Sequence, residues 1–307
     1  MRIAIVGAGG VGGVLGGLLA RAGSEVALVA RGEHLRAIRE RGLRVETPKG
    51  PFEVRVDAAE DPGALRPADA VLIAVKTWQL QDVASRLPPL LGPGAVAVPL
   101  LNGIGAADTL AQVLGRERVC GGLAHLFAWI AGPGVVKTAG VPPRVTVGEL
   151  YGKGRARLEQ LCAALRDGGV DASVVDDVRS ALWEKLLFVG PLGAVGAAAR
   201  SPAGVLRTTA ETRALLEKAM REVLAVARAR GVPVSETAVG SALARTDSLP
   251  PDGTTSMHRD LVSGRRSELD DLVGAVVRAA AETGTPAPAH EFLWACLLPQ
   301  ERAARRP

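Results

Sequence analysis

The chain is poor in aromatic residues, cysteine and metal-ligand patterns, and each shortage excludes a class of protein. Aromatic residues make up 3% of its 307 residues, so the stacking platforms of nucleic-acid-binding proteins are not expected. Its three cysteines, Cys120, Cys162 and Cys296, are widely spaced and include no Cys-x-x-Cys pair. This pattern predicts reduced thiols in a cytosolic protein and excludes a disulfide framework. No residues have metal-ligand spacing, so no metal site is expected.

Long apolar runs and a leader sequence are also missing. Glycine and proline interrupt every apolar stretch before it reaches the roughly 20 residues that a membrane span needs. The chain opens directly on a strand and shows no signal-peptide pattern. Its net charge of +5 comes from acids and bases that alternate, with one basic cluster at 301–307 that is expected to be a solvated tail. These features predict a cytoplasmic protein with neither membrane nor nucleic acid among its partners.

Two further shortages make single residues informative. The chain has 31 arginines but six lysines, and Asn102 is its single asparagine. Such a bias is typical of a GC-rich genome, in which lysine and asparagine codons are disfavoured. A lysine or asparagine that is present despite this bias is a candidate for chemistry, which directs attention to Lys76, Asn102 and Lys185.

The first 31 residues combine a strand, a glycine turn, a helix and a second strand. These elements are predicted at Arg2–Val6, Val11–Ala22 and Glu25–Ala30. The turn reads Gly-x-Gly-x-x-Gly and consists of Gly7, Ala8, Gly9, Gly10, Val11 and Gly12. In this context the motif predicts a dinucleotide site, with Gly7 in the tight turn, Gly9 beside the pyrophosphate and Gly12 against the sheet. An ordinary glycine turn is the alternative.

Arg31 follows the second strand, where an NAD-binding chain carries Asp or Glu for the ribose 2′-hydroxyl. A guanidinium at this position suits a 2′-phosphate, which it can bind through two charge-assisted hydrogen bonds. His34 and Arg36 follow closely. The sequence therefore favours NADPH as the cofactor, and the alternative is a solvated arginine in an arginine-rich chain.

The predicted secondary structure changes from alternating strands and helices in the first half of the chain to helices alone in the second half. Strands predicted at Asp69–Val75 and Ala95–Leu101 precede Lys76 and Asn102, and ligands of open α/β sheets bind beyond such strand ends. Val119–Val147 is predicted to form several short strands around a Gly132-Pro133-Gly134 turn. Helical spacing follows at 179–189, 209–230, 267–283 and 290–302. The prediction is a Rossmann-type domain with a parallel-sheet core at 1–175, an all-helical domain at 176–307 and an active site in the cleft between them.

Lys185 is the one lysine in an otherwise apolar helical segment, Trp183–Phe188. Reduction of a carbonyl by a nicotinamide cofactor needs a proton donor. A partly desolvated lysine beside a cationic nicotinamide has a lowered pKa and can be a general acid near neutral pH. The alternative is a surface lysine whose stem packs on apolar neighbours. Taken alone, Ser267 followed by Asp270 resembles a helix cap, and a favourable interaction with the helix dipole is the alternative for Glu268.

Several short motifs together resemble the ketopantoate reductase (2-dehydropantoate 2-reductase) family over nearly the whole chain. Besides the glycine motif they are Val29-Ala30-Arg31-Gly32, Val75-Lys76-Thr77-Trp78-Gln79, Leu101-Asn102-Gly103-Ile104-Gly105, Gly132-Pro133-Gly134-Val135-Val136, Leu182-Trp183-Glu184-Lys185-Leu186, Ser256-Met257 and Ser267-Glu268-Leu269-Asp270. The resemblance implies that Lys185 donates the proton and that Ser256 binds the substrate carboxylate. It also implies cofactor contacts for Arg31, Lys76, Asn102 and Glu268.

One stretch departs from the family pattern. The family carries Lys-x-x-x-Asn-x-x-x-Asn along this helix, and both amides bind the substrate. Here the substrate-binding positions are occupied by Val189 and Gly193, and a third amide position carries Ala203. These residues predict a roomier, more apolar substrate pocket. Pro191 in the same stretch predicts a helix that is kinked or ends early.

The sequence therefore predicts an NADPH-dependent oxidoreductase that reduces a 2-oxo acid, and the resemblance implies a place in pantothenate biosynthesis. One alternative is a reductase of a different carbonyl or imine compound in specialised metabolism. Another is a non-catalytic NADPH-binding sensor. The natural substrate and the oligomeric state, a homodimer included, stay open.

Overall fold

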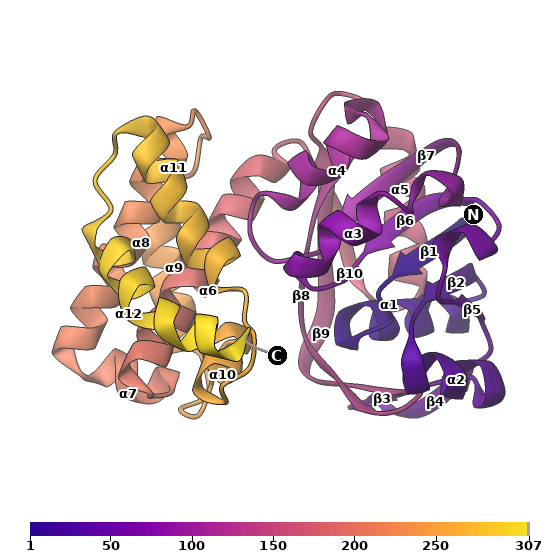
Figure 1. The fold of residues 1–307 in the computed structure, drawn as a ribbon, viewed down its shortest axis with the longest axis horizontal. Coiled ribbons are helices and arrows are strands. Elements are labelled where there is room, and N and C mark those ends of the chain that lie inside the picture. The colour runs from indigo at the N-terminus through magenta and orange to yellow at the C-terminus, as the bar shows by residue number, and fades with distance from the viewer. Residues whose placement is uncertain (306–307) are drawn as a thin grey trace. The chain divides into compact units, whose positions relative to one another are not determined.

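The computed structural model describes residues 1–305, apart from the side chain of Val141, and divides the chain into two units (Figure 1). Unit 1 consists of Met1–Leu101 and Ala106–Val178, and unit 2 of Asn102–Gly105 and Arg179–Pro307. The last two residues of the predicted basic tail lie outside the described residues. The domain boundary was predicted between residues 175 and 176, and the structure divides the chain three residues later, after Val178.

A five-stranded sheet with the strand order β5-β2-β1-β6-β7 forms the first part of unit 1 (Figure 1). Its strands are β1 (Arg2–Val6), β2 (Glu25–Val29), β5 (Asp57–Ala59), β6 (Ala68–Ile73) and β7 (Leu91–Pro99). All neighbours pair in parallel, so the carboxyl ends of the strands share one edge. Ile3 and Ile5 enter one apolar cluster, while Ala4 and Val6 enter another, as expected for a strand buried on both faces. The predicted Rossmann-type core is confirmed.

Helix α1 (Gly10–Arg21) packs between this sheet and a second sheet (Figure 1). Glycines on two of its faces permit the close approach. A Cβ at Gly16 would lie 2.9 Å from the Leu28 side chain in β2, and one at Gly17 would collide with Val45 in the second sheet. Close packing of this kind explains why an apolar helix contains so many glycines, despite their cost to helix stability.

The second sheet has the order β10-β9-β3-β4, with β8 paired to β9. Its strands are β3 (Leu43–Thr47), β4 (Gly50–Val54), β8 (Cys120–Gly132), β9 (Val135–Glu149) and β10 (Asp171–Val175). The prediction of several short strands in Val119–Val147 was wrong, because β8 and β9 are two long antiparallel strands. Register shifts between His125 and Phe127 and between Ile130 and Gly132 interrupt the alternation that a sequence pattern relies on.

Short helices cover the remainder of unit 1. They are α2 (Gly32–Arg41), α3 (Leu80–Ala84), α4 (Ala106–Leu114), α5 (Arg155–Asp167) and the 3-10 turns Pro62–Ala64, Thr77–Gln79, Pro88–Leu90 and Arg116–Arg118. Leu80 and Leu110 pack into the cluster that contains Val6, whereas Leu158 and Leu161 pack into the cluster that contains Ile5. Helices therefore cover both faces of the parallel sheet.

Every regular element among the described residues of unit 2 is a helix. Its elements are α6 (Val178–Ala199), α7 (Ala203–Thr208), α8 (Ala210–Ala229), α9 (Ala238–Asp247), α10 (Ser256–Val262), a π-helix (Asp270–Gly274), α11 (Ala275–Thr283) and α12 (Pro288–Ala304). A single apolar cluster joins these helices. The predicted all-helical second half is confirmed.

Helix α6 bears on two expectations, an early end at Pro191 and the absence of a long apolar run. It continues through Pro191 to Ala199 instead of ending early. Burial of Leu186, Leu187 and Leu192 contributes about 1.5–3 kcal/mol each, which offsets the roughly 3 kcal/mol cost of an internal proline. By length and composition α6 could also cross a membrane, although no such run was expected, and 67% of its apolar window is buried inside the protein. Such burial is typical of a core helix.

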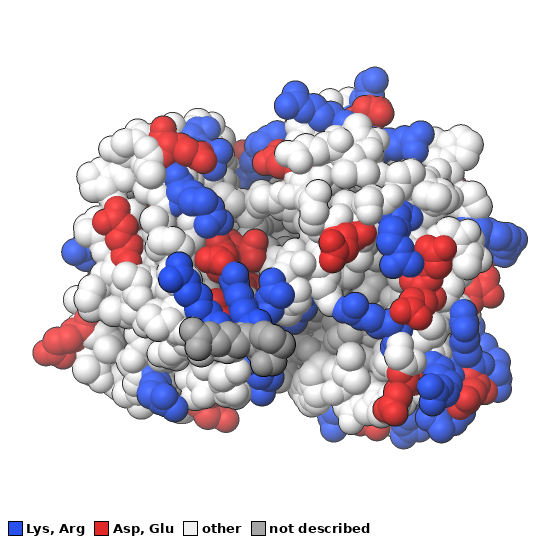
Figure 2. All heavy atoms as spheres, in the orientation of Figure 1, with Lys and Arg blue, Asp and Glu red and all other residues white. Residues whose placement is uncertain are grey.

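Charges of both signs are interspersed on the face shown in Figure 2. Many charged side chains of the protein form ion pairs, and Arg155 contacts both Glu159 and Asp176. Exposed pairs of this kind contribute about 0–1 kcal/mol each. The apolar clusters therefore supply most of the stability of the fold.

Candidate functional site

The turn after β1 has the geometry that the glycine motif predicts. Gly7 has a φ of +101°, in the region that strains a side chain. Its N–H and that of Ala8 both donate to the carbonyl oxygen of Val29, at 3.0 and 3.1 Å. A Cβ at Gly12 would collide with the Gly7 carbonyl oxygen, and a Cβ at Gly9 would meet nothing within 4 Å. The start of α1 therefore packs tightly on the strand, while space remains open beside Gly9.

Helix α1 begins at Gly10 with Gly9 as its N-cap residue, and no side chain caps it. The N–H groups of its first turn and the positive end of the helix dipole suit a pyrophosphate. Strand β8 runs close by, because a Cβ at Gly10 would lie 2.5 Å from the Ala128 carbonyl oxygen. The open space at Gly9 and the uncapped helix start therefore fit a dinucleotide.

Two of the predicted cofactor residues lie at the same edge of the sheet as this turn. Arg31 follows β2, is exposed and is the N-cap residue of α2. Lys76 follows β6 and is exposed, and its Nζ lies 5.6 Å from the ring centroid of Trp78. Because β2, β1 and β6 are parallel neighbours, the structure brings Arg31, Lys76 and the glycine turn to one edge.

The other predicted polar residues gather in unit 2. The Asn102 Nδ2 donates to Oε2 of Glu268 at 2.9 Å, and Glu268 is only 5% exposed. The loop that carries Asn102 packs against the π-helix, since a Cβ at Gly103 would lie 2.8 Å from the Asp271 carbonyl oxygen. The single asparagine of the chain therefore orients a buried carboxylate. The alternative for Glu268, a favourable interaction with the dipole of the following helix, stays a prediction.

Lys185 on α6 lies among apolar residues and charged neighbours. Burial is the main cause that lowers the pKa of Lys185; the Glu268 carboxylate raises it, the positive charge of Arg245 lowers it, and the result is a pKa of about 8. Its ammonium is therefore mostly protonated at neutral pH, yet close enough to its pKa to release a proton. The lowered pKa expected from the sequence is confirmed, and its role as proton donor stays a prediction.

Arg245 is a neighbour of Lys185 that the sequence did not indicate. It lies near the end of α9, and its guanidinium carbon is 4.5 Å from the centroid of the Phe188 ring on α6. Phe188 follows Lys185 by about one helical turn. Scarcity singled out lysine and asparagine, whereas one arginine among 31 carries no such signal.

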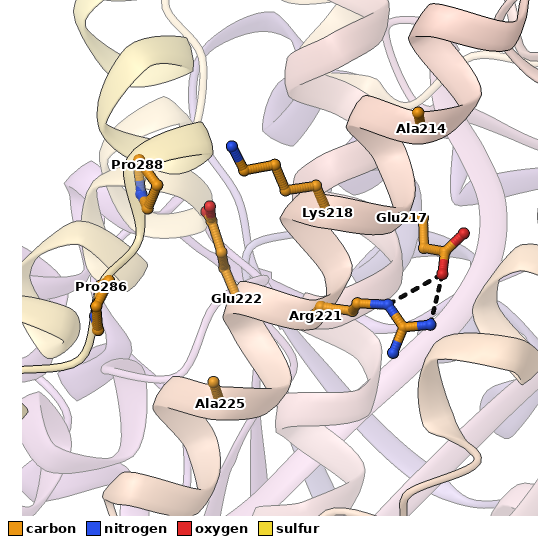
Figure 3. Close-up of a pocket in the computed structure, with 8 residues that line it drawn as sticks. All are labelled: Ala214, Glu217, Lys218, Arg221, Glu222, Ala225, Pro286 and Pro288. Carbon is orange, nitrogen blue, oxygen red and sulfur yellow. Dashed lines mark hydrogen bonds and ion pairs between the residues drawn. The ribbon is translucent and has the colours of Figure 1, made fainter.

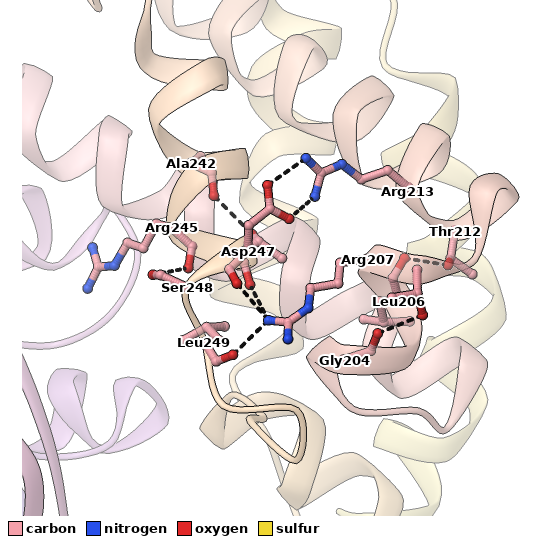
Figure 4. Close-up of polar contacts among 12 residues, drawn as sticks. Gly204, Leu206, Arg207, Thr212, Arg213, Ala242, Arg245, Asp247, Ser248 and Leu249 are labelled. Carbon is pink, nitrogen blue, oxygen red and sulfur yellow. Dashed lines mark hydrogen bonds and ion pairs between the residues drawn. The ribbon is translucent and has the colours of Figure 1, made fainter.

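A polar network anchors the end of α9 that carries Arg245 (Figure 4). The Arg207 side chain donates to the carbonyl oxygens of Asp247 at 2.8 Å and Leu249 at 2.7 Å. Asp247 in turn pairs with Arg213, and this hydrogen bond holds the pKa of the Asp247 carboxyl below its usual value. Cations of α7 and α8 therefore satisfy the end of α9 and fix its position.

The extra space expected at Gly193 is not present. Gly193 is buried, and a Cβ there would lie 2.7 Å from both the Met257 Cε and the Thr255 Oγ1. Val189 packs against the helical core, and Ala203 is only 1% exposed. The expectation of a roomier pocket at Gly193 was wrong, because side chains from the start of α10 fill the volume.

The same contact places the start of α10 against α6. Ser256 is the first residue of α10, and the Thr255 hydroxyl caps this helix by accepting the His258 N–H at 3.1 Å. Substrate binding by Ser256 stays a prediction. Ser267 has a structural role, since its hydroxyl donates to Glu301 at 2.6 Å and accepts the Leu269 N–H at 3.2 Å.

A surface groove of about 570 Å³ lies along α8 and the loop before α12 (Figure 3). It is lined by Ala214, Glu217, Lys218, Arg221, Glu222, Ala225, Pro286 and Pro288. The Glu222 carboxylate accepts the N–H groups of Ala289 at 2.8 Å and His290 at 3.0 Å, and thereby caps α12. The groove contains none of the predicted site residues, and both of its acidic residues have structural partners, because Glu222 caps α12 and Glu217 accepts a hydrogen bond from Arg221.

Family models match both halves of the chain. The model described as "Ketopantoate reductase PanE/ApbA" matches residues 3–152, and "Ketopantoate reductase PanE/ApbA C terminal" matches residues 177–301. A 2-dehydropantoate 2-reductase of Halobacterium salinarum is 36% identical over 287 residues, which cover 92% of this chain and 93% of the relative. An uncharacterized oxidoreductase, YkpB of Bacillus subtilis, is 28% identical and covers 97% of this chain and 98% of its own length.

Solved structures agree with these sequence matches. A PanE/ApbA family ketopantoate reductase from Ralstonia eutropha has a TM-score of 0.90 at 36% identity and covers 100% of both chains. A D-mandelate dehydrogenase in complex with NADH has a TM-score of 0.87 at 25% identity, with 99% of this chain and 100% of the other covered. The likeness therefore extends over both units.

Proposed function

Because the chain belongs to the ketopantoate reductase family, we propose that it is an NADPH-dependent reductase of a 2-oxo acid. The observation that carries the proposal is the environment of Lys185, a partly buried lysine influenced by the Glu268 carboxylate that Asn102 orients. The glycine turn supports the cofactor, and Arg31 at the end of β2 supports the choice of NADPH over NADH.

In the proposed mechanism each unit supplies part of the chemistry. The glycine turn and the start of α1 hold the pyrophosphate, and Arg31 holds the 2′-phosphate. When bound, the nicotinamide supplies the hydride to the carbonyl carbon. The Lys185 ammonium donates its proton to the carbonyl oxygen, and Glu268 favours the protonated form of that lysine before each turnover. Ser256, at the start of α10, binds the substrate carboxylate.

A cofactor-consumption assay tests this function. The purified protein should oxidise NADPH in the presence of at least one member of a panel of 2-oxo acids, and yield the matching 2-hydroxy acid by mass spectrometry. Activity with aldehydes, ketones or imines alone would identify a reductase of a different substrate. Tight NADPH binding without turnover of any compound would identify a sensor, and absence of dinucleotide binding would contradict the proposal.

Arg31→Asp should abolish or invert a preference for NADPH. A charge-assisted hydrogen bond contributes about 1.5–3 kcal/mol, so the unaltered protein should prefer NADPH by roughly 10–100-fold. Dissociation constants for both cofactors measure the effect. Arg36→Asp makes the same charge change on an exposed position of α2 and should change the preference far less. Equal affinity of the unaltered protein for the two cofactors would contradict the assignment of Arg31.

The charges around Lys185 predict opposite shifts of the pH profile. If protonated Lys185 is the acid, kcat/KM for reduction should fall as the pH rises through about 8. Arg245→Gln removes a like charge, raises the pKa of Lys185 and should move this limb to higher pH. Glu268→Gln removes an opposite charge and should move it to lower pH. Shifts in the same direction, or a profile without the limb, would contradict the assignment.

A further inference from the structure

His34 connects the glycine turn to the turn between β8 and β9. Its ring lies on α2 and is partly buried. The His34 Nε2 lies 2.9 Å from the Ala8 carbonyl oxygen, and the Gly134 N–H donates to Nδ1 at 3.0 Å. A carbonyl can only accept and a backbone N–H can only donate. The two contacts therefore assign the neutral imidazole with its proton on Nε2.

The Gly134 side of this bridge is held firmly. A Cβ at Gly134 would lie 2.9 Å from the Ala37 Cβ, which is one turn beyond His34 on α2. The Gly134 carbonyl oxygen accepts the N–H of Arg44 from β3 at 2.9 Å. Both polar groups of Gly134 are therefore engaged, and the imidazole ring extends from a fixed anchor.

The Ala8 side of the bridge bears on the dinucleotide turn. The Ala8 N–H already donates to Val29, and the Gly9 carbonyl oxygen accepts the Gly13 N–H at 2.7 Å. With His34 bonded to its carbonyl oxygen, both polar groups of Ala8 are fixed. The Ala8–Gly9 peptide is trans, so its N–H points opposite to its carbonyl. The orientation of the Gly9 N–H, at the N-cap of α1, is thereby set from His34.

We propose that His34 is a positioning residue for the dinucleotide, which acts through the Ala8 carbonyl to aim the Gly9 N–H. The ligand it serves is the NADPH of the proposed function, so this part rests on that proposal. His34 need not touch the cofactor. A merely structural anchor for α2 would affect stability and leave cofactor affinity unchanged, and this difference makes the proposal testable.

Two amide variants separate the two contacts of the ring. The Nε2 of glutamine can reach the place of the imidazole Nε2, so His34→Gln retains a donor to Ala8. The shorter asparagine places its amide near Nδ1, so His34→Asn retains an acceptor for Gly134 and loses the donor. We expect the Gln variant to bind NADP⁺ almost as tightly as the unaltered protein. The Asn variant and His34→Phe should bind about tenfold more weakly, the effect of about one net hydrogen bond.

Arg39→Gln is the matched control. Arg39 lies on the same helix, and its Nε donates to the carbonyl oxygen of Ala58 at 2.9 Å, away from the glycine turn. Its loss should lower stability at most and leave the NADP⁺ dissociation constant unchanged. Equal affinity in the Asn and Gln variants of His34, or a loss in Arg39→Gln as large as in His34→Asn, would overturn the proposal.

Measurements without cofactor separate this inference from the proposed function. Nitrogen NMR of the ligand-free protein should show the His34 ring protonated on Nε2. Amide exchange of Ala8 and Gly13 should be faster in His34→Asn than in His34→Gln. Failure of the unaltered protein to bind any dinucleotide would refute the proposed function. The opposite tautomer, or equal exchange in the two variants, would refute the ordering of the turn by His34.

Discussion

Lys185→Ala should lose about 10²–10⁴-fold in kcat while its affinity for NADPH stays unchanged. The factor is that of a general acid, because hydride addition to a carbonyl leaves an oxyanion that must be protonated. Burial and the charge of Arg245 bring the pKa of Lys185 to about 8, so its proton is available near neutral pH. Steady-state kinetics and a separate dissociation constant for NADPH distinguish loss of chemistry from loss of binding.

Two further substitutions sharpen this test. Lys185→Arg keeps the charge but should not restore activity, because a guanidinium hardly releases its proton. Lys185→Met keeps the length of the side chain and should be as inactive as Lys185→Ala. It should also unfold at a higher temperature than the unaltered protein, since no charge then needs burial. If Lys185→Ala were active, Lys185 would not be the proton donor, and Glu268 would be the next candidate.

The parallel-sheet unit was predictable because local signals determine it. The strand Arg2–Val6, the glycine turn and Arg31 just after β2 all lie within one short segment, and the glycines specify the turn without help from distant residues. The β8–β9 pair was misjudged since its register shifts arise only when the strands pair. Continuation of α6 through Pro191 likewise depends on burial against other helices.

The candidate site was predictable only where composition or family resemblance marked a residue. Scarcity singled out Asn102 and Lys185, but nothing local to Glu268 predicted its hydrogen bond with Asn102. Arg245 on α9 and Lys185 on α6 are 60 residues apart in the sequence, so the effect of Arg245 on the pKa of Lys185 exists only in the folded chain. The bridge made by His34 likewise joins residues that are distant in sequence.

Ketopantoate should be a poor substrate, by roughly a hundredfold or more in kcat/KM relative to an apolar 2-oxo acid. Val189, Gly193 and Ala203 occupy the positions at which the family resemblance implies substrate-binding amides. Each missing net hydrogen bond costs about 0.5–1.5 kcal/mol, so two or three together cost roughly 2–4 kcal/mol. Ketopantoate turnover at about 10⁴ M⁻¹s⁻¹ or above would contradict this expectation.

The packing around Gly193 determines whether an asparagine introduced at this position can restore ketopantoate turnover. A Cβ at Gly193 would lie 2.7 Å from both the Met257 Cε and the Thr255 Oγ1, so an asparagine there would displace these side chains. Gly193→Asn alone should therefore lower stability by about 1–3 kcal/mol through overpacking, and leave ketopantoate turnover low. In the double variant, Met257→Ala removes the side chain that an asparagine at position 193 would displace. The double variant should therefore be more stable than Gly193→Asn alone and recover some ketopantoate turnover. If Gly193→Asn by itself restored turnover without loss of stability, the filled position would not be the cause of the discrimination.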